Sequence, residues 1–398
     1  MVRIQIKKEL VKSPLRDLLK IVKELKGMKT YPFNIGDPNK FDFDTPEFLK
    51  NELIKAVKER NGYYSEAEGD MELRKTIVER ENKKNNASIT EDDVIITQGI
   101  SEGLSFIFSS LIDSEKDEFL LPGPAYPSYI QYIKFFGGKY ATYKTDESDS
   151  WQPDIDDLRK KINENTKLIS IINPNNPTGS VYESRIVKEI VNIAGEEEIP
   201  VLSDEIYDEL IFDNTRYEGT SSIAKDIPVI GLNGFSKSYL VPGWRLGYMY
   251  FHDAQNQLSR LKELIKSLAR NRLSACTPVM KAFVGIYSKP RDHIEIINKK
   301  LKDRAAFAHK KLNEIEGISA VKPQGAFYIF PKVELNGRWK NDEEFCIDLL
   351  KNTGIIFPYG SGFDPVYGKD HFRSVILPPV EMMEEAFGKL EDFMKNSK

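Results

Sequence analysis

The residues best suited to chemistry lie in the stretch 231–248, which places one lysine, Lys237, between two apolar runs at 227–232 and 246–251. Glycine and proline punctuate this loop, so it can hold the lysine at the end of a sheet and away from bulk water. Removal from water favours the neutral amine over the ammonium, and a neutral amine attacks carbonyl carbons. Most lysines are solvated surface residues, so Lys237 needs support from other parts of the chain before it is assigned such a role.

Two polar loops follow other strand-like runs. The stretch 173–179 (Asn-Pro-Asn-Asn-Pro-Thr-Gly) follows the run 168–172, and its prolines can hold Asn176 in one orientation. A Ser-Asp-Glu-Ile-Tyr stretch ends another run and places Asp204 and Tyr207 within reach of one cleft. Taken alone, the first loop is interpreted more simply as a rigid turn and Asp204 as a helix cap.

A third stretch, Thr-Gln-Gly-Ile-Ser-Glu-Gly at 97–103, has the order of a strand, a glycine turn and a helix start. Exposed backbone N–H groups at such a helix start bind phosphate. The stretch contains neither G-x-G-x-x-G nor G-x-x-x-x-G-K-[ST], so it lacks the common nucleotide-binding motifs. Taken alone, the glycine in this stretch indicates only that a helix begins after it.

The wider pattern is an alternation of short apolar runs and amphipathic segments. Strands are expected at 94–97, 118–121, 168–172, 201–202, 227–232 and 246–251. Helices are expected at 101–112, 128–136, 155–162 and 183–194. This alternation predicts an α/β fold with a mainly parallel sheet flanked by helices, whose ligands bind at the carboxyl ends of the strands.

Helices are also expected before the alternation begins. The first starts near Ser13, and the second is opened by Thr45 as N-cap with Pro46 at the first helical position. The second helix would turn toward the core the side chains of Leu49, Leu53, Ile54 and Val57.

The pattern changes again after residue 290. A long helical stretch is followed by short strands at 318–321 and 326–330, a helix at 343–351, a strand at 372–377 and a helix from 380. Because 398 residues are more than one core usually supports, we expect two domains. The large domain would be 46–289, and the small α/β domain would combine 1–45 with 290–398.

Composition excludes several classes of protein. The chain has 57 Lys and Arg against 61 Asp and Glu, a net charge of −4 without long like-charge blocks, so no basic face for nucleic acid or anionic lipid is expected. Two distant cysteines argue against a disulfide framework, and four histidines without H-E-x-x-H argue against a metal enzyme. With no leader sequence and no apolar stretch of about 20 residues, we expect a cytoplasmic protein.

Taken together, the motifs of these loops are specific enough to indicate a protein family. Their motifs are Asn-Pro-x-Asn-Pro-Thr-Gly, Ser-Asp-Glu-Ile-Tyr and Ser-Lys-x-x-x-x-Pro-Gly-Trp-Arg-x-Gly-Tyr, each after a successive strand. In this order they resemble the fold-type I aminotransferases that use pyridoxal 5′-phosphate. The resemblance runs from Asn34 to the Phe372 block, essentially the whole chain. It implies a seven-stranded type of sheet in the large domain.

The resemblance also implies roles for the residues at matching positions. Lys237 would hold the cofactor aldehyde as a Schiff base and then move a proton between the substrate Cα and the cofactor. Asp204 would pair with the pyridine nitrogen and keep it protonated. Tyr207 and Asn176 would donate hydrogen bonds to the ring oxygen, and Tyr126 would stack on the ring.

The cofactor phosphate would lie on the helix start at Ile100, Ser101 and Glu102 and be clamped by Arg245. We call the groups that would surround the phosphate the phosphate cup. The sequence departs from the family pattern at two places, so some members of this cup are not assigned. Ile100 replaces a second glycine of many relatives, and Glu102 brings a carboxylate, so its backbone would have to face the phosphate. Gly234 replaces the serine of one branch, so the hydroxyls that complete the cup are sought among Thr97, Ser101 and Ser236.

On the substrate side, Arg373 would pair with the α-carboxylate, and Gly36 would allow the backbone to approach it closely. In the family, the tyrosine matching Tyr64 reaches the phosphate of the neighbouring subunit, so a homodimer is implied. No metal is expected in the site.

Several stretches are most similar to the alanine aminotransferase branch, among them Gly-Ile-Ser-Glu-Gly-Leu at 99–104 and Gly-Ser-Gly-Phe at 360–363. The leading reaction is alanine plus 2-oxoglutarate giving pyruvate plus glutamate. An aspartate or broad-specificity aminotransferase is the alternative, since it shares every cofactor residue. Arg272, near Arg270, is a candidate for the second carboxylate of 2-oxoglutarate, or else a solvated helix-end charge.

Two other classes were weighed. Some transcription factors use the same scaffold as a ligand-binding domain, but they carry a basic helix-turn-helix module before it, and only about 30 residues precede the Asn34 loop here. A serine-lysine hydrolase would use Ser222 and Lys225, which match S-x-x-K by a pattern too short to be specific.

Overall fold

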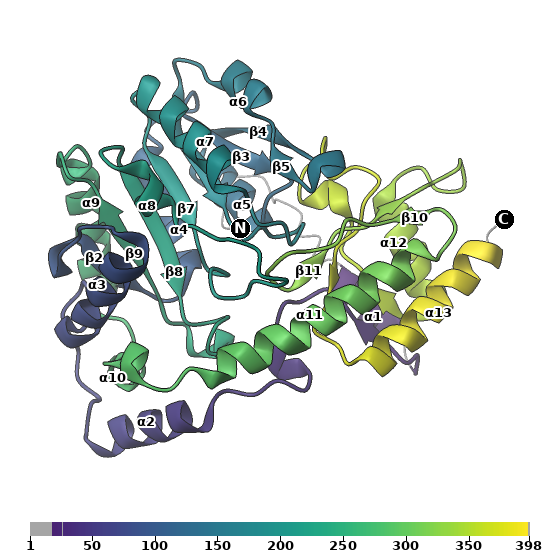
Figure 1. Ribbon diagram of the computed structural model, residues 1–398, viewed down its shortest axis with the longest axis horizontal. Coiled ribbons are helices and arrows are strands. Elements are labelled where there is room, and N and C mark those ends of the chain that lie inside the picture. Colours follow the sequence, from purple (N-terminus) through teal and green to yellow (C-terminus); the bar gives the residue numbers. More distant parts are fainter. Residues whose placement is uncertain (1–17, 26, 397–398) are drawn as a thin grey trace, which may run out of the picture.

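The computed structural model describes residues 18–25 and 27–396. A larger part is built on an eight-stranded sheet, and a smaller part contains residues from both ends of the chain (Figure 1). The long helix α11 (Asp292–Asn313) runs from one part to the other. The predicted domain limits at 45/46 and 289/290 stay a prediction.

The sheet has the strand order β2-β9-β8-β7-β6-β3-β4-β5. Its strands are β2 (Val94–Thr97), β3 (Glu118–Gly123), β4 (Lys139–Asp146), β5 (Gln152–Pro153), β6 (Thr166–Ile172), β7 (Val201–Asp204), β8 (Val229–Gly234) and β9 (Gly247–His252). The five strands from β8 to β4 are parallel, while β9 is antiparallel to both of its neighbours. The predicted α/β fold with a mainly parallel sheet is confirmed.

Two strands, β4 and β5, were not predicted. They form one end of the sheet, where several side chains of β4 stay partly exposed. Lysines and threonines therefore interrupt the apolar residues of β4, and the continuous apolar run that marks a buried parallel strand is missing. The two-residue β5 makes the sheet eight-stranded where the family resemblance implied seven.

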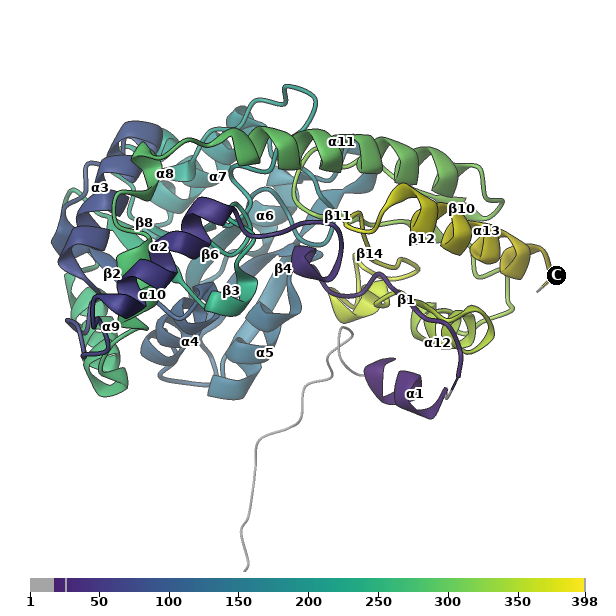
Figure 2. The same ribbon diagram turned by 90° about the horizontal axis from the view of Figure 1, so that it is seen from below.

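Helices cover both faces of the sheet because successive side chains of a strand point to opposite sides. In β6, Leu168 and Ile172 face one cluster of helices, while Ile169 and Ile171 face another. The first cluster contains α4 (Ile100–Leu111), α5 (Pro127–Phe136) and α9 (Ser259–Arg272). The second contains α6 (Ile155–Lys161), α7 (Ser184–Glu196) and α8 (Thr220–Ala224). Figure 2 shows the two helical layers on either side of the strands.

A third cluster joins α3 (Met71–Asn85), α10 (Thr277–Ala282) and α2 (Glu47–Lys58) to the sheet end formed by β2 and β9. The prediction for the start of α2 is wrong by one residue. Pro46 is the N-cap, and the hydroxyl of Thr45 donates to the carbonyl oxygen of Leu240 at 2.9 Å instead of capping the helix.

The predicted core face of α2 is also wrong in part. Leu49 and Ala56 are buried, but Ile54 is 51% exposed and Val57 is 60% exposed. The helix lies on the outside of the molecule and packs on α10 along a narrow stripe of positions spaced by three to four residues. Ile54 and Val57 lie beside this stripe and are left as an exposed apolar surface.

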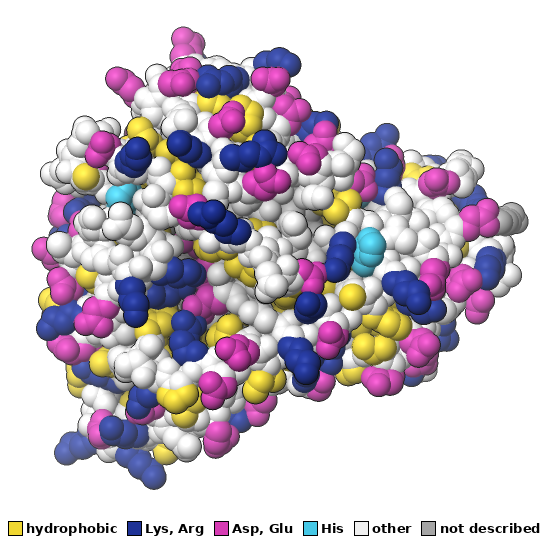
Figure 3. Space-filling view, viewed as in Figure 1, with side chains coloured by type: hydrophobic (Ala, Val, Ile, Leu, Met, Phe, Trp, Pro, Cys, Tyr) yellow, Lys and Arg dark blue, Asp and Glu magenta, His cyan; other side chains and the backbone are white. Residues whose placement is uncertain are grey.

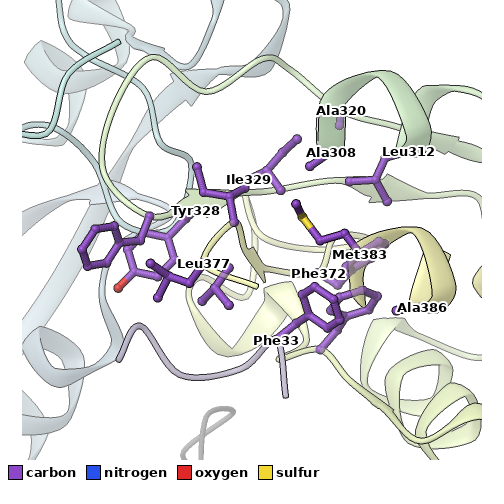
Figure 4. Packing of buried hydrophobic residues seen from close by; sticks show 14 of the residues in the cluster. Phe33, Ala308, Leu312, Ala320, Tyr328, Ile329, Phe372, Leu377, Met383 and Ala386 are labelled. Carbon is purple, nitrogen blue, oxygen red and sulfur yellow. The ribbon is translucent and has the colours of Figure 1, made fainter. Parts of the chain in front are cut away.

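The main core of the smaller part joins residues from both halves of the chain, among them Phe33 and Met383. Tyr31 of β1 pairs in parallel with Ile355 of β13, and Phe33 packs in one cluster with Phe372 and Met383 (Figure 4). Its elements are α1 (Leu18–Glu24), β1 (Tyr31–Pro32), β10 (Ile318–Ser319), β11 (Tyr328–Ile329), β12 (Lys332–Val333), α12 (Asp342–Thr353), β13 (Ile355–Ile356), β14 (Ser374–Val375) and α13 (Val380–Asn396). The start expected for the first helix lies outside the described residues.

On the face drawn in Figure 3, positive and negative side chains are interspersed, in line with the small net charge of −4. Within residues 18–25 and 27–396, no helix is both long and apolar enough to cross a membrane.

Candidate active site

Residue pairing across the sheet brings the predicted loops to one edge. Asp204 at the end of β7 lies opposite Leu232 of β8, and Thr97 at the end of β2 lies opposite Gly247 at the start of β9. Because β9 runs antiparallel to β8, Gly247 also lies opposite Gly234, the last residue of β8. The loops that carry the candidate residues therefore start or end along the same side of the sheet.

Lys237 reaches from the loop after β8 to the N-terminal segment of the chain. Its Nζ donates a hydrogen bond to the carbonyl oxygen of Gly36 at 2.8 Å. The same nitrogen lies 5.5 Å from the ring centre of Phe327 and 5.8 Å from that of Tyr207. The amine is thus enclosed by aromatic faces and by one carbonyl group.

Burial lowers the pKa of Lys237 to about 8. The negative charge of Asp37 opposes this effect, the positive charges of Arg373 and Arg245 add to it, and Asp204 opposes it weakly. An ordinary lysine has a pKa near 10.4, so a much larger fraction of Lys237 is the neutral, nucleophilic amine at neutral pH.

Asp204 is a buried carboxylate with two hydrogen-bond donors. The N–H of Ile206 donates to Oδ1 at 3.2 Å, and the hydroxyl of Tyr129 donates to Oδ2 at 3.0 Å. Burial raises the pKa of Asp204 to about 6, although both hydrogen bonds act in the opposite direction. Tyr129 was not predicted as a site residue, and the signal for it in the sequence is its position three residues after Tyr126, one turn along α5.

Arg373 is a fully buried cation at 1% exposure. Its Nη1 donates to Oδ1 of Asn176 at 2.9 Å, its Nη2 donates to the carbonyl oxygen of Asn34, and its guanidinium lies 4.4 Å from the ring centre of Tyr328. Its Nε has no hydrogen-bond partner among the described residues. A buried guanidinium with a free donor is suited to an anionic ligand.

Tyr328, which ends a Gly-Ala-Phe-Tyr stretch at 325–328, is a second site residue that was not predicted. Its hydroxyl is 2.6 Å from the hydroxyl of Tyr207. A Cβ atom at Gly36 would lie 2.4 Å from the Tyr328 hydroxyl, so only glycine fits there. A Cβ atom at Gly179, where φ is +73°, would lie 2.3 Å from the Tyr328 carbonyl oxygen. Tyr328 therefore joins the N-terminal segment, the 173–179 loop and Tyr207.

The stretch predicted to bind phosphate forms a glycine turn followed by a helix start. Gly99 has φ of +73°, and a Cβ atom there would lie 2.4 Å from Nη2 of Arg245. Arg245 donates to the carbonyl oxygen of Gln98 at 3.2 Å. Helix α4 begins at Ile100, so its first N–H groups, which have no carbonyl one turn earlier, point out of the helix start beside this arginine. A turn of this kind binds anions.

Glu102 does not fit the role of a direct phosphate donor. Its N–H is donated to the carbonyl oxygen of Gly99 at 3.1 Å, and its carboxylate accepts the N–H of Gln98 at 2.8 Å. The residue supports the turn from within, because both of its polar groups are used inside it.

The remaining candidates differ in exposure. Thr97 is fully buried, and its hydroxyl has no partner among the described residues, whereas Ser236 is buried and Ser101 partly buried. Tyr126 is half-buried at the start of α5. Tyr64 is 78% exposed, so the single chain does not enclose it.

Both terminal nitrogens of Arg272 are already used in contacts within the chain. Its Nη1 donates to the carboxylate of Glu102 at 2.7 Å, and its Nη2 donates to the carbonyl oxygen of Ala67 at 2.6 Å. Both nitrogens also lie 3.3 Å from the carbonyl oxygen of Ile96. These contacts go against the predicted pairing with 2-oxoglutarate.

The other chemistries find little support in the geometry. The hydroxyl of Ser222 donates to the carbonyl oxygen of Gly219 at 2.7 Å, and Lys225 is exposed. Within the described part of the chain, no three His, Cys, Asp or Glu side chains come together as a metal site.

Comparison with known proteins agrees with this arrangement. The model of the family "Aminotransferase class I and II" matches residues 31–390. The chain belongs to this family. The aminotransferase is 35% identical over 377 residues to glutamate-pyruvate aminotransferase AlaA of Haemophilus influenzae, a match that covers 94% of this chain and 92% of the relative.

Two further proteins are similar over nearly their whole length. Alanine aminotransferase of Mycobacterium bovis is 34% identical over 377 residues, covering 93% of this chain and 87% of the relative. The solved structure of an alanine aminotransferase from Pyrococcus furiosus superposes with a TM-score of 0.94 at 52% identity, covering 97% of this chain and 98% of that one. The resemblance drawn from the motifs and the aminotransferase activity are therefore confirmed.

Proposed function

We propose that the aminotransferase binds pyridoxal 5′-phosphate at the site formed by Lys237, Asp204 and Arg373 and transfers the amino group of L-alanine to 2-oxoglutarate. The products are pyruvate and L-glutamate. The observation that carries the proposal is the convergence of a nucleophilic amine, a buried carboxylate and an anion-binding helix start on one edge of the sheet. When bound, this cofactor supplies an aldehyde and an electron-withdrawing ring, which stabilise negative charge at the substrate Cα.

The amine of Lys237 and the carboxylate of Asp204 match two groups of this cofactor, its aldehyde and its ring nitrogen. Lys237, whose pKa is lowered to about 8, would hold the aldehyde carbon and later carry the proton to and from the substrate Cα. Asp204 is buried, and none of the described residues donates a hydrogen bond to it from a cationic side chain, so a protonated ring nitrogen would supply the positive charge that this site favours.

The phosphate group would be received by the start of α4 at Ile100 and Ser101 and by Arg245. Support comes from the positive φ of Gly99 and from the close approach of Arg245 to it. The hydroxyls of Ser236 and Thr97 are candidates to complete the cup, since the buried Thr97 hydroxyl has no other partner among the described residues. Tyr126 and Tyr207 would contact the ring and its oxygen.

Arg373 would bind the α-carboxylate of each substrate, oriented by Asn176 and by the ring of Tyr328. Its guanidinium is already removed from water, so little desolvation remains to oppose the pairing. The Tyr328 hydroxyl occupies the space that a Cβ atom at position 36 would need, so only the backbone of Gly36 would face this carboxylate.

We infer alanine as the preferred donor from the relatives, which are named glutamate-pyruvate and alanine aminotransferases. The test is a single-turnover measurement on the cofactor-loaded enzyme, mixed separately with L-alanine and L-aspartate in the absence of an oxo acid. Alanine should convert the enzyme to its amine form much faster than aspartate. Faster conversion by aspartate would reverse the substrate assignment and leave the cofactor chemistry in place.

We also propose a homodimer in which Tyr64 reaches the phosphate site of the partner. Its support is the exposure of four large apolar or aromatic side chains, Ile54, Val57, Tyr63 and Tyr64, which are 51%, 60%, 52% and 78% exposed. Tyr63 and Tyr64 line a hollow of about 320 Å³ that also includes Arg245. A solution mass of one chain, about 45.6 kDa, at micromolar concentration would refute the dimer.

A location in the cytoplasm is part of the same proposal. It is supported by Cys276 and Cys346, which are both free thiols.

A further inference from the structure

Arg272 contacts two segments that are far apart in the sequence. Through Glu102 and the carbonyl oxygen of Ile96 it touches the phosphate turn, and through the carbonyl oxygen of Ala67 it touches the loop that carries Tyr64. The side chains of Arg272 and Glu102 are only 10% and 17% exposed, so the pair is shielded from salt and water.

The phosphate turn is held through the backbone of Gln98, whose N–H group and carbonyl oxygen both have side-chain partners. The N–H of Gln98 is donated to the carboxylate of Glu102 at 2.8 Å, and the carbonyl oxygen of Gln98 accepts from Arg245 at 3.2 Å. Arg272 holds that carboxylate in place at 2.7 Å and neutralises its charge. Without Arg272, the carboxylate of Glu102 would be a mobile negative charge at an anion site.

The loop that carries Tyr64 is held on both sides of that residue by the segment that ends and follows α9. The hydroxyl of Thr277 donates to the carbonyl oxygen of Tyr63 at 2.6 Å, and Arg272 donates to that of Ala67 at 2.6 Å. Leu273, which follows Arg272 directly, has φ of +77° and ψ of −84°. Such a conformation is strained for leucine and is kept only where the surroundings require it.

We propose that Arg272 and Glu102 are positioning residues for the cofactor phosphate, and that Arg272 fixes the phosphate turn and the Tyr64 loop together. Arg272 thereby acts on the phosphate site of its own chain and on the residue offered to the partner. This inference rests on the proposed function, because it assigns the phosphate of pyridoxal 5′-phosphate to that turn.

The test compares two probes that differ only in the phosphate. Cofactor-free wild-type protein and the variant Arg272→Gln are titrated with pyridoxal 5′-phosphate and with pyridoxal, and bound probe is followed by its visible absorbance. We expect Arg272→Gln to lose roughly 10- to 100-fold in affinity for pyridoxal 5′-phosphate, the size expected for hydrogen bonds to charged groups, with affinity for pyridoxal nearly unchanged. Equal losses for the two probes, or no loss for either, would overturn the proposal.

The matched control is Arg270→Gln. Arg270 lies two residues earlier on the same helix, is 59% exposed, and its nearest carboxylates are 3.7 and 3.9 Å away. It should leave both affinities unchanged. If Arg272→Gln fails to fold, Arg272→Lys decides, since it keeps a positive charge beside Glu102 but lacks the second terminal nitrogen that reaches the carbonyl oxygen of Ala67, and it should show a smaller loss that is again selective for the phosphate. An unchanged ratio of the two affinities in Arg272→Lys would overturn the proposal.

The coupling of the two segments has its own readout. Amide hydrogen exchange in 62–69 and in 97–102 should speed up together in Arg272→Gln and in neither segment in Arg270→Gln. Faster exchange in only one segment would refute the coupling. If wild-type protein binds neither probe, the proposed function fails, whereas failure of the inference alone leaves wild-type binding intact.

Discussion

The substitution Asp204→Asn should stabilise the cofactor-free enzyme while destroying its activity. Burial raises the pKa of Asp204 from 3.8 to about 6, so the folded state binds a proton that the unfolded state has already released. Between these two pKa values the stability of the folded state falls as pH rises, and above pH 6 the full loss is present. Asparagine carries no charge at any of these pH values and does not suffer this loss.

The size of the effect follows from the two pKa values. A difference of about two units corresponds to about 3 kcal/mol, since one unit is about 1.4 kcal/mol. By proton linkage, the advantage of Asp204→Asn over wild type should be about 1.5 kcal/mol at pH 5 and about 3 kcal/mol at pH 8. Asparagine can keep the hydrogen bond from the N–H of Ile206, because it retains one carbonyl oxygen.

The assay compares the apparent unfolding temperatures of cofactor-free wild-type protein and Asp204→Asn at pH 5, 6.5 and 8. The control is Asp149→Asn, a substitution of an exposed aspartate. The gap between Asp204→Asn and wild type should widen as pH rises. With pyridoxal 5′-phosphate bound, the order should reverse at pH 8, because only the carboxylate gains a cationic ring nitrogen. A gap that is constant with pH, or an Asp204→Asn protein that is less stable at pH 8 without cofactor, would refute the reasoning.

Three further predictions follow from the same contacts. Tyr129→Phe removes one hydrogen bond to a charged group, worth about 1.5 to 3 kcal/mol, and should raise the pKa of Asp204 by about one to two units, measured as a shifted pH midpoint of the stability gap above. Arg373→Ala should raise KM for alanine roughly 10- to 100-fold with a smaller change in kcat, while equal losses in both would contradict a role in substrate capture. The rate at which cofactor-free enzyme captures pyridoxal 5′-phosphate should rise through pH 8 as Lys237 loses its proton, and a rate flat from pH 7 to 9 would contradict the lowered pKa.

The sequence predicted the site best where a polar loop directly follows a buried apolar strand. The loops with Asn176, Asp204 and Lys237 each follow a buried apolar run, so the edge where they meet could be predicted from the alternation alone. Burial makes such runs continuous and easy to recognise. At the exposed edge, β4 mixes polar and apolar residues, so it gave no such signal.

Contacts between distant segments could not be predicted. Arg272 and Glu102 are 170 positions apart, and no local pattern indicates that they form an ion pair. The same holds for Tyr328, whose hydroxyl meets Gly36 and Tyr207 only after both ends of the chain have packed together. For Ile54 the pattern predicted a contact with the core that the structure does not have. Helical spacing of apolar residues does not reveal whether the surface they form packs against the core of the same chain.

The most direct test of the central claim is the visible absorbance spectrum of Lys237→Ala after it is loaded with pyridoxal 5′-phosphate and washed with a small amine. Wild-type protein should show a pH-sensitive visible band that survives gel filtration, because the cofactor is bonded to Lys237. The variant should lose this band and turn over no alanine. A wild-type protein without such a band, or a variant that keeps it after washing, would contradict the assignment of Lys237 as the residue that holds the cofactor.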